Sequence, residues 1–138
     1  MTYWKDSLLV GVYQIDSQHR KLVAAIDRLM DACMQGQGRD TIGQTLNYTL
    51  SYTKEHFRDE ELLQAKYAYP GLSAHRQLHA SFVANITALV QEFEQTGPNI
   101  SLAAKLNKTL IDWLIRHIST EDKKLGEHIR KAEGGTGL

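Results

Sequence analysis

Histidines and a glutamate, whose side chains can bind metals, recur in this sequence at helical spacing. If these stretches are helices, the residues lie on the same faces as the apolar residues. Residues three and four apart lie on the same face of a helix. By that rule, each of four apolar-periodic stretches carries at least one histidine on its inward face, and the second stretch also carries a glutamate. This inward-facing set is His19, His56, Glu60, His75, His79 and His117.

Burying these groups separately would be costly. A single inward histidine is most often a hydrogen-bonded core residue, but a carboxylate at a core position costs several kcal/mol unless it is paired or binds a metal. The pairs His56/Glu60 and His75/His79 are each four residues apart, so each pair can present two ligands to one centre. One shared metal site would satisfy the whole set, and we therefore expect a metal centre inside the protein.

The fourth stretch contains a change of helical phase. Continuing the repeat past His117 predicts an inward Glu121, whereas the later apolar residues Leu125 and Ile129 fit a phase that passes through Asp122. A π-turn supplies one extra residue of this kind, and π-turns concentrate at functional sites. We therefore predict a π-turn from His117 to Asp122, with Asp122 as the seventh ligand.

The composition of the ligand set restricts the metal. Seven ligands exceed the four of a tetrahedral zinc site, and the His75-Arg76-Gln77-Leu78-His79 segment lacks the glutamate that follows the first histidine in a zinc-protease helix. A histidine-rich nitrogen and oxygen set suits iron, manganese or cobalt. Two octahedral ions that share bridging carboxylates and an oxygen atom would keep one position open for a small ligand.

Four amphipathic helices position these residues. Asp16 and Ser17 are candidate N-caps of the first helix, and glycine or proline interrupts the pattern between helices. Short loops between such helices favour an all-α fold, an antiparallel up-down four-helix bundle in one domain spanning 1–138. The expected segments are an ordered N-terminal arm at 1–16, helices at about 17–35, 40–65, 72–95 and 101–130, and a frayed tail at 132–138.

Charge and composition argue against several kinds of partner. Sixteen Lys and Arg balance sixteen Asp and Glu, so the chain lacks the basic field that nucleic-acid binding requires. No apolar run is long enough to span a membrane. Cys33 is the single cysteine, which excludes an internal disulfide. We expect a cytoplasmic monomer.

The motifs around these ligands make the sequence recognisable. It resembles the hemerythrins, specifically their single-domain bacterial members, over residues 3–130. The matching stretches are Trp4, Gly11-Val12, Ile15-Asp16-Ser17-Gln18-His19, His56-Phe57-Arg58-Asp59-Glu60-Glu61, Tyr69-Pro70, His75-Arg76-Gln77-Leu78-His79 and Trp113-Leu114-Ile115-Arg116-His117-Ile118-Ser119-Thr120-Glu121-Asp122.

The resemblance implies a non-haem di-iron centre with an oxo or hydroxo bridge, and reversible dioxygen binding for storage, transport or delivery rather than enzymatic turnover. It implies that the iron held by two histidines keeps an open position for dioxygen. The implied ligands are His75, His79 and His117 for one iron, His19 and His56 for the other, and Glu60 and Asp122 as bridges.

The resemblance also implies an apolar oxygen pocket lined by Phe57, Trp113, Leu114 and Ile118, although plain core packing is the alternative reading of these residues. An apolar wall admits dioxygen and keeps out the water and protons that promote irreversible oxidation.

Three residues depart from the family pattern or have no role in it. Gln64 stands where many relatives have methionine, which predicts more polar packing there. His128 is expected at the surface, and Cys33 is expected to be a buried packing residue.

Two other functions compete with oxygen carriage. One is sensing of dioxygen or redox state through a signalling partner, and the other is a di-iron enzyme acting on peroxide, nitric oxide or iron. The five imidazoles outnumber the two carboxylates, whereas di-iron oxidases use carboxylate-rich sites, and this balance favours oxygen binding.

Overall fold

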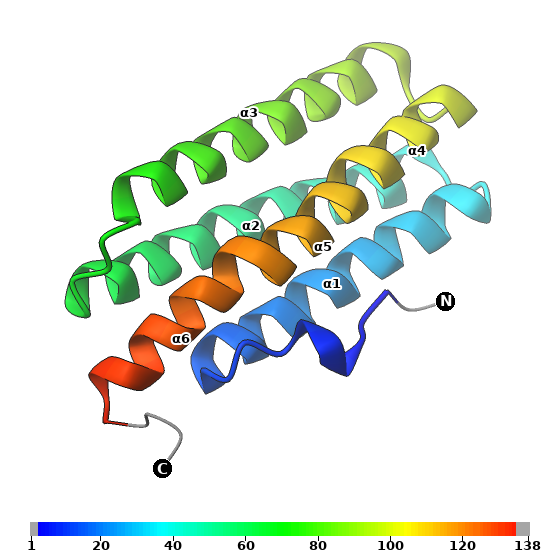
Figure 1. The fold of residues 1–138 in the computed structure, drawn as a ribbon. Coiled ribbons are helices and arrows are strands. Elements are labelled where there is room, and N and C mark those ends of the chain that lie inside the picture. Colours follow the sequence, from blue (N-terminus) through cyan, green and yellow to red (C-terminus); the bar gives the residue numbers. More distant parts are fainter. Residues whose placement is uncertain (1–2, 135–138) are drawn as a thin grey trace.

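The protein folds into an antiparallel four-helix bundle, as the sequence predicts. The computed structural model describes residues 3–134, and its regular elements over that range are all helical. Three long helices and a segmented fourth rod lie side by side (Figure 1). Their bounds are α1 (Tyr13–Met34), α2 (Arg39–Lys66), α3 (Leu72–Thr96) and, in the fourth rod, α4 (Ile100–Leu106), η2 (Asn107–Asp112), α5 (Trp113–His117), η3 (Ile118–Asp122) and α6 (Lys123–Ala132).

The turns between the rods contain residues suited to ending and starting helices. Gly36 and Gly97 follow α1 and α3 with φ angles of 66° and 73°, a conformation that favours glycine. The side chain of Asn99 then caps α4, because its oxygen accepts the backbone N–H of Leu102 at 2.8 Å. These residues reverse the chain sharply and keep successive rods antiparallel.

Apolar side chains from all four rods form one core. Leu29 of α1, Leu46 of α2, Ile86 of α3 and Leu106 of α4 are each at most 1% exposed. Buried ionisable residues gather toward the end of the bundle where α1 and α3 begin and where α2 ends. This end of the bundle contains the site, and the apolar remainder supports it.

An ordered arm precedes α1, and it runs along the bundle through a short 3-10 helix, η1 (Asp6–Leu8). Asp16 was expected as an N-cap, but α1 begins earlier, at Tyr13, with Val12 as a cap that makes no side-chain bond. The carboxylate of Asp16 instead accepts the backbone N–H groups of Val10 at 2.8 Å and Gly11 at 3.1 Å. Asp16 therefore ties the arm to the bundle.

The fourth rod contains two π-helical segments, η2 and η3. The second of them, Ile118–Asp122, is the π-turn that the change of hydrophobic phase predicts. The first, Asn107–Asp112, was not anticipated from the sequence.

Parts of the predicted ends, residues 1–2 of the arm and 135–138 of the tail, lie outside the described residues. Over residues 3–134, no helix combines the length and apolar character needed to cross a membrane.

Candidate metal centre

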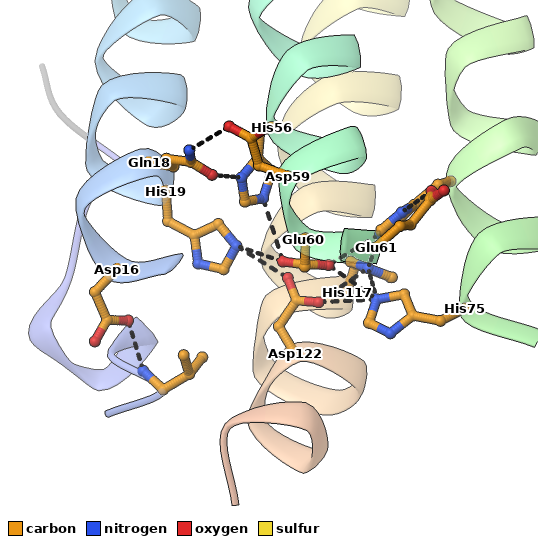
Figure 2. Close-up of polar contacts among 12 residues, drawn as sticks. Asp16, Gln18, His19, His56, Asp59, Glu60, Glu61, His75, His117 and Asp122 are labelled. Carbon is orange, nitrogen blue, oxygen red and sulfur yellow. Dashed lines mark hydrogen bonds and ion pairs between the residues drawn. The ribbon is translucent and has the colours of Figure 1, made fainter. Parts of the chain in front are cut away.

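All four rods contribute to one buried cluster of histidines and carboxylates. Figure 2 shows His19 and His56 on one side of the two carboxylates, and His75 and His117 on the other. Every member is at most 5% exposed, so none of them is solvated in the usual way. The members are His19 from α1, His56 and Glu60 from α2, His75 and His79 from α3, His117 from α5 and Asp122 from η3.

Ligand atoms in this cluster fall into two overlapping groups, within each of which the atoms lie no more than 4.8 Å apart. We call the histidines of the larger group, His75, His79 and His117, the three-histidine set. The histidines of the smaller group, His19 and His56, are the two-histidine set. Glu60 and Asp122 belong to both groups.

Each carboxylate directs one oxygen toward each histidine set. For Glu60, Oε1 lies 3.1 Å from Nε2 of His79, and Oε2 lies 3.3 Å from Nε2 of His56. For Asp122, Oδ1 lies 3.2 Å from Nε2 of His117, and Oδ2 lies 3.0 Å from Nε2 of His19. Two carboxylates divided in this way are arranged to bridge two cations.

The π-turn determines which acidic side chain enters the cluster. Asp122 is 1% exposed, whereas the neighbouring Glu121 is half-buried and its carboxylate lies 3.9 Å from Nζ of the exposed Lys124. One additional residue in the turn rotates Asp122 inward and Glu121 toward the surface.

The donor atoms at the centre of the cluster are placed to coordinate a metal rather than to form hydrogen bonds with one another. Nε2 of His75 lies 2.8 Å from Nε2 of His117, so two ring nitrogens point at the same place. Within residues 3–134, several other inward atoms are buried and lack a partner in hydrogen-bond geometry: Nε2 of His19 and His56, both oxygens of Glu60, and Oδ1 of Asp122. Such groups are costly unless a cation coordinates them, so the residues fit a pair of metal ions.

Before a metal binds, the two carboxylates favour the protonated forms of His19 and His75. Burial by itself lowers the pKa of His19, but close contacts and charges from Asp122 and Glu60 outweigh it and raise this pKa to about 9. The same balance raises the pKa of His75 to about 9. Burial raises the pKa of Glu60, yet its contacts with His19, His56 and other histidines hold this pKa well below its usual range. Metal binding must therefore displace protons.

Two polar side chains behind the ligands were missed in the sequence analysis. The Nδ1–H of His56 faces Oε1 of Gln18 at 2.7 Å, and the Gln18 amide nitrogen donates to Asp59 at 2.9 Å. Nδ1 of His79 lies 2.9 Å from Oε2 of Glu61. A partner on the outer nitrogen orients a metal-binding imidazole. The available signal was sequence adjacency, because Gln18 precedes His19 and Glu61 follows Glu60.

The residues expected to line an oxygen pocket divide between two sides of the cluster. Phe57 stacks on the ring of His79 with centroids 3.7 Å apart, and Trp113 stacks on His117 at 4.4 Å, so both lie beside the three-histidine set. Trp113 also stacks on Phe82 of α3 at 3.9 Å. This side of the fourth rod therefore faces α3.

Leu114 and Ile118 lie on the other side of the fourth rod. Leu114 lies three residues before His117, and Ile118 lies one residue after it. This spacing places both on the flank of the rod away from Trp113. They are 1% and 0% exposed. The fourth rod also packs on α1, the helix that carries His19, through α4 and η2.

Two further residues differ from their expected settings. His128 was expected at the surface, but it is half-buried and its Nε2 lies 2.7 Å from the carbonyl oxygen of Tyr67. Cys33 was expected to be buried, but it is only half-buried and lines a cavity of about 470 Å³ at the opposite end of the bundle. Neither belongs to the metal centre.

Comparison with known proteins agrees with this geometry. The family model described as the hemerythrin HHE cation binding domain matches residues 10–129. A bacteriohemerythrin of Stenotrophomonas maltophilia is 31% identical, over 92% of this chain and 80% of the relative. A bacteriohemerythrin of Pseudomonas aeruginosa is 30% identical, over 96% of this chain and 90% of the relative. A myohemerythrin of Riftia pachyptila is 29% identical over 88% of each chain.

The match spans nearly the whole described bundle, including all seven members of the cluster. Membership of this family implies a di-iron, oxygen-binding protein. The helical bundle, the buried cluster and the matched family model lead to one conclusion: the chain belongs to the hemerythrin family.

Proposed function

We propose that this protein binds dioxygen reversibly at a di-iron centre and thereby stores, transports or delivers oxygen. In this proposal, the three-histidine set holds one iron, the two-histidine set holds the other, and Glu60 and Asp122 bridge them. The two irons, when bound, supply the electrons that dioxygen binding requires.

The division of the carboxylate oxygens is the observation that carries this proposal. Glu60 and Asp122 each offer one oxygen to each histidine set, at 2.9–3.6 Å from the nearest ring nitrogens. A single ion would leave one side of this arrangement without a cation. Three histidines on one side and two on the other also leave the second iron with fewer protein ligands, and dioxygen would bind there.

Leu114 and Ile118 protect that position in the proposal. Their buried apolar side chains lie next to His117 on the fourth rod, on the flank away from Trp113, and we place them against the two-histidine set. They exclude water and anions while admitting apolar dioxygen. Phe57 and Trp113 hold the imidazoles of His79 and His117 from the other side through ring stacking.

The balance of ligands favours binding over turnover. Five neutral imidazoles and two carboxylates donate less charge to the irons than a carboxylate-rich site does, and this disfavours cleavage of the oxygen–oxygen bond. The protein is therefore proposed to be a carrier and not an enzyme.

Metal analysis together with optical spectroscopy tests the proposal. We expect two irons per chain and an absorption band that appears with dioxygen and disappears when dioxygen is removed. Azide should compete for the same open position. One zinc ion per chain would contradict the metal assignment, and sustained consumption of oxygen or peroxide by the iron-loaded protein would contradict a carrier role.

A further inference from the structure

Gln64 is a buried amide beside the metal centre that the proposed function does not use. It lies on α2, four residues after Glu60 and therefore one turn further along the same face. Its side chain is 0% exposed, and neither its oxygen nor its nitrogen has a hydrogen-bond partner within residues 3–134. Buried amides are nearly always satisfied, so this one requires a partner.

On two neighbouring rods, the positions one turn below the metal ligands are occupied by apolar residues. Ile15 lies one turn before His19 on α1, and Leu125 lies about one turn after Asp122 on α6. Both side chains are apolar and 0% exposed. Neither side chain can hydrogen-bond to Gln64, whereas the metal ligands one turn along the bundle are polar.

Two metal ligands on that side have unpartnered outer nitrogens. Nδ1 of His19 and Nδ1 of His75 are buried and make no hydrogen bond with the described residues. Their Nε2 atoms face the carboxylates (Figure 2). A neutral imidazole that binds metal through Nε2 carries its proton on Nδ1, so both histidines need an acceptor.

The loop between α2 and α3 connects Gln64 to one of these histidines. The backbone N–H of Tyr69 donates to the backbone carbonyl of Gln64 at 2.8 Å. The ring of Tyr69 packs edge-on against His75, with centroids 6.3 Å apart. Tyr69 therefore contacts both the backbone of Gln64 and the ring of His75.

We propose that Gln64 binds internal water beneath the metal centre, and that this water accepts the outer N–H groups of His19 and His75. The amide suits this role because it can donate to water through Nε2 and accept from water through Oε1. Buried water of this kind completes otherwise unsatisfied polar groups. Gln64 is then a positioning residue that acts on one ligand of each iron through water.

The proposal rests on the proposed ligand roles of His19 and His75, and its test compares Gln64→Met with the wild-type chain. Methionine has a similar length and cannot replace the amide hydrogen bonds, and Gln64→Leu provides a second apolar variant. Long-lived internal water is counted by oxygen-17 magnetic relaxation dispersion, with and without bound iron. Affinity for Co²⁺ is measured by titration as an independent readout.

We expect both variants to lose long-lived internal water and to bind Co²⁺ about tenfold more weakly, the range seen when groups behind metal ligands are removed. Thr49→Val is the matched control, because Thr49 is equally buried on α2 but already donates to the carbonyl oxygen of Thr45 at 2.8 Å. It should keep the wild-type water count.

An unchanged water count in Gln64→Met and Gln64→Leu would overturn the inference, even where both variants load two irons and bind dioxygen. Failure of the wild-type chain to load two irons would instead contradict the proposed function. The water count of the metal-free protein still tests Gln64 in that case.

Discussion

Nδ1 of His79 lies 2.9 Å from a carboxylate oxygen of Glu61, whereas Nδ1 of His56 lies 2.7 Å from the amide oxygen of Gln18. The two histidine sets therefore differ in the hydrogen-bond partners of their outer nitrogens as well as in their number of histidines. A carboxylate partner makes an imidazole a stronger donor than an amide partner does. We therefore expect His79 to be a stronger donor to a bound cation than His56.

Replacing Glu61 by glutamine should weaken this support. We expect Glu61→Gln to lower iron affinity by about tenfold and to raise the reduction potential of the centre, because His79 becomes a weaker donor. Titration with Fe²⁺ and potentiometry measure these effects. Glu55→Gln, which neutralises an exposed carboxylate on the same helix, should change neither. Equal potentials for Glu61→Gln and wild type would refute the role of Glu61.

The π-turn buries Asp122 in the cluster and leaves Glu121 outside it, so we predict a metal-binding role for Asp122 and none for Glu121. We expect Asp122→Asn to reduce the iron content below two per chain, because the amide replaces an anionic bridge. Glu121→Gln, one residue away and half-buried, should retain two irons. Metal analysis of the purified variants decides between them, and the opposite pattern would mean that η3 does not orient these residues as described.

Leu114 is predicted to keep water from the open position. Leu114→Ala should accelerate autoxidation of the oxygenated protein at least several-fold, measured as decay of its absorption band. Leu106→Ala is the matched control, since Leu106 is equally buried on the same rod and lies two turns away. Both changes should cost about 2–5 kcal/mol of unfolding free energy. Equal autoxidation rates in the two variants would make Leu114 a packing residue only.

Stability and metal affinity should depend on pH in opposite ways. The pKa values of His19 and His75 in the metal-free fold are raised to about 9 from 6.5. The folded state therefore binds more protons than the unfolded state, and the metal-free protein loses stability as the pH rises from 6.5 through about 9. Metal binding displaces those protons, so affinity for Co²⁺ should increase over the same interval.

Chemical denaturation of the metal-free protein and Co²⁺ titration, each repeated across this interval, measure the two trends. His128→Gln removes a histidine outside the cluster and should leave both slopes unchanged. A metal-free protein that gains stability between pH 6.5 and 9 would contradict the raised pKa values.

The bundle was predictable because the sequence features that indicate each helix lie within that helix or at its ends. Apolar residues at helical spacing, with glycine and proline between the stretches, indicate four helices without any knowledge of their contacts. The start of α1 was not predictable in the same way. Asp16 has the properties of an N-cap, but its carboxylate bonds to Val10 and Gly11 of the arm instead, and the helix extends back to Tyr13.

The sequence by itself also determined the types of the ligands and their inward phase, down to the shift that brings Asp122 rather than Glu121 into the cluster. Spacing along one helix is enough for this, because each residue advances the helical face by a constant angle. Which oxygen of Glu60 faces which histidine set depends on four rods at once.

Only the tertiary structure decided the groups behind the ligands. Gln18 meets His56 from another helix, Glu61 meets His79 across the α2–α3 interface, and Gln64 lies one turn below with no protein partner among the described residues. These relationships depend on the rotation and axial offset of neighbouring rods. Helical periodicity contains no information about either quantity, because it describes one helix at a time.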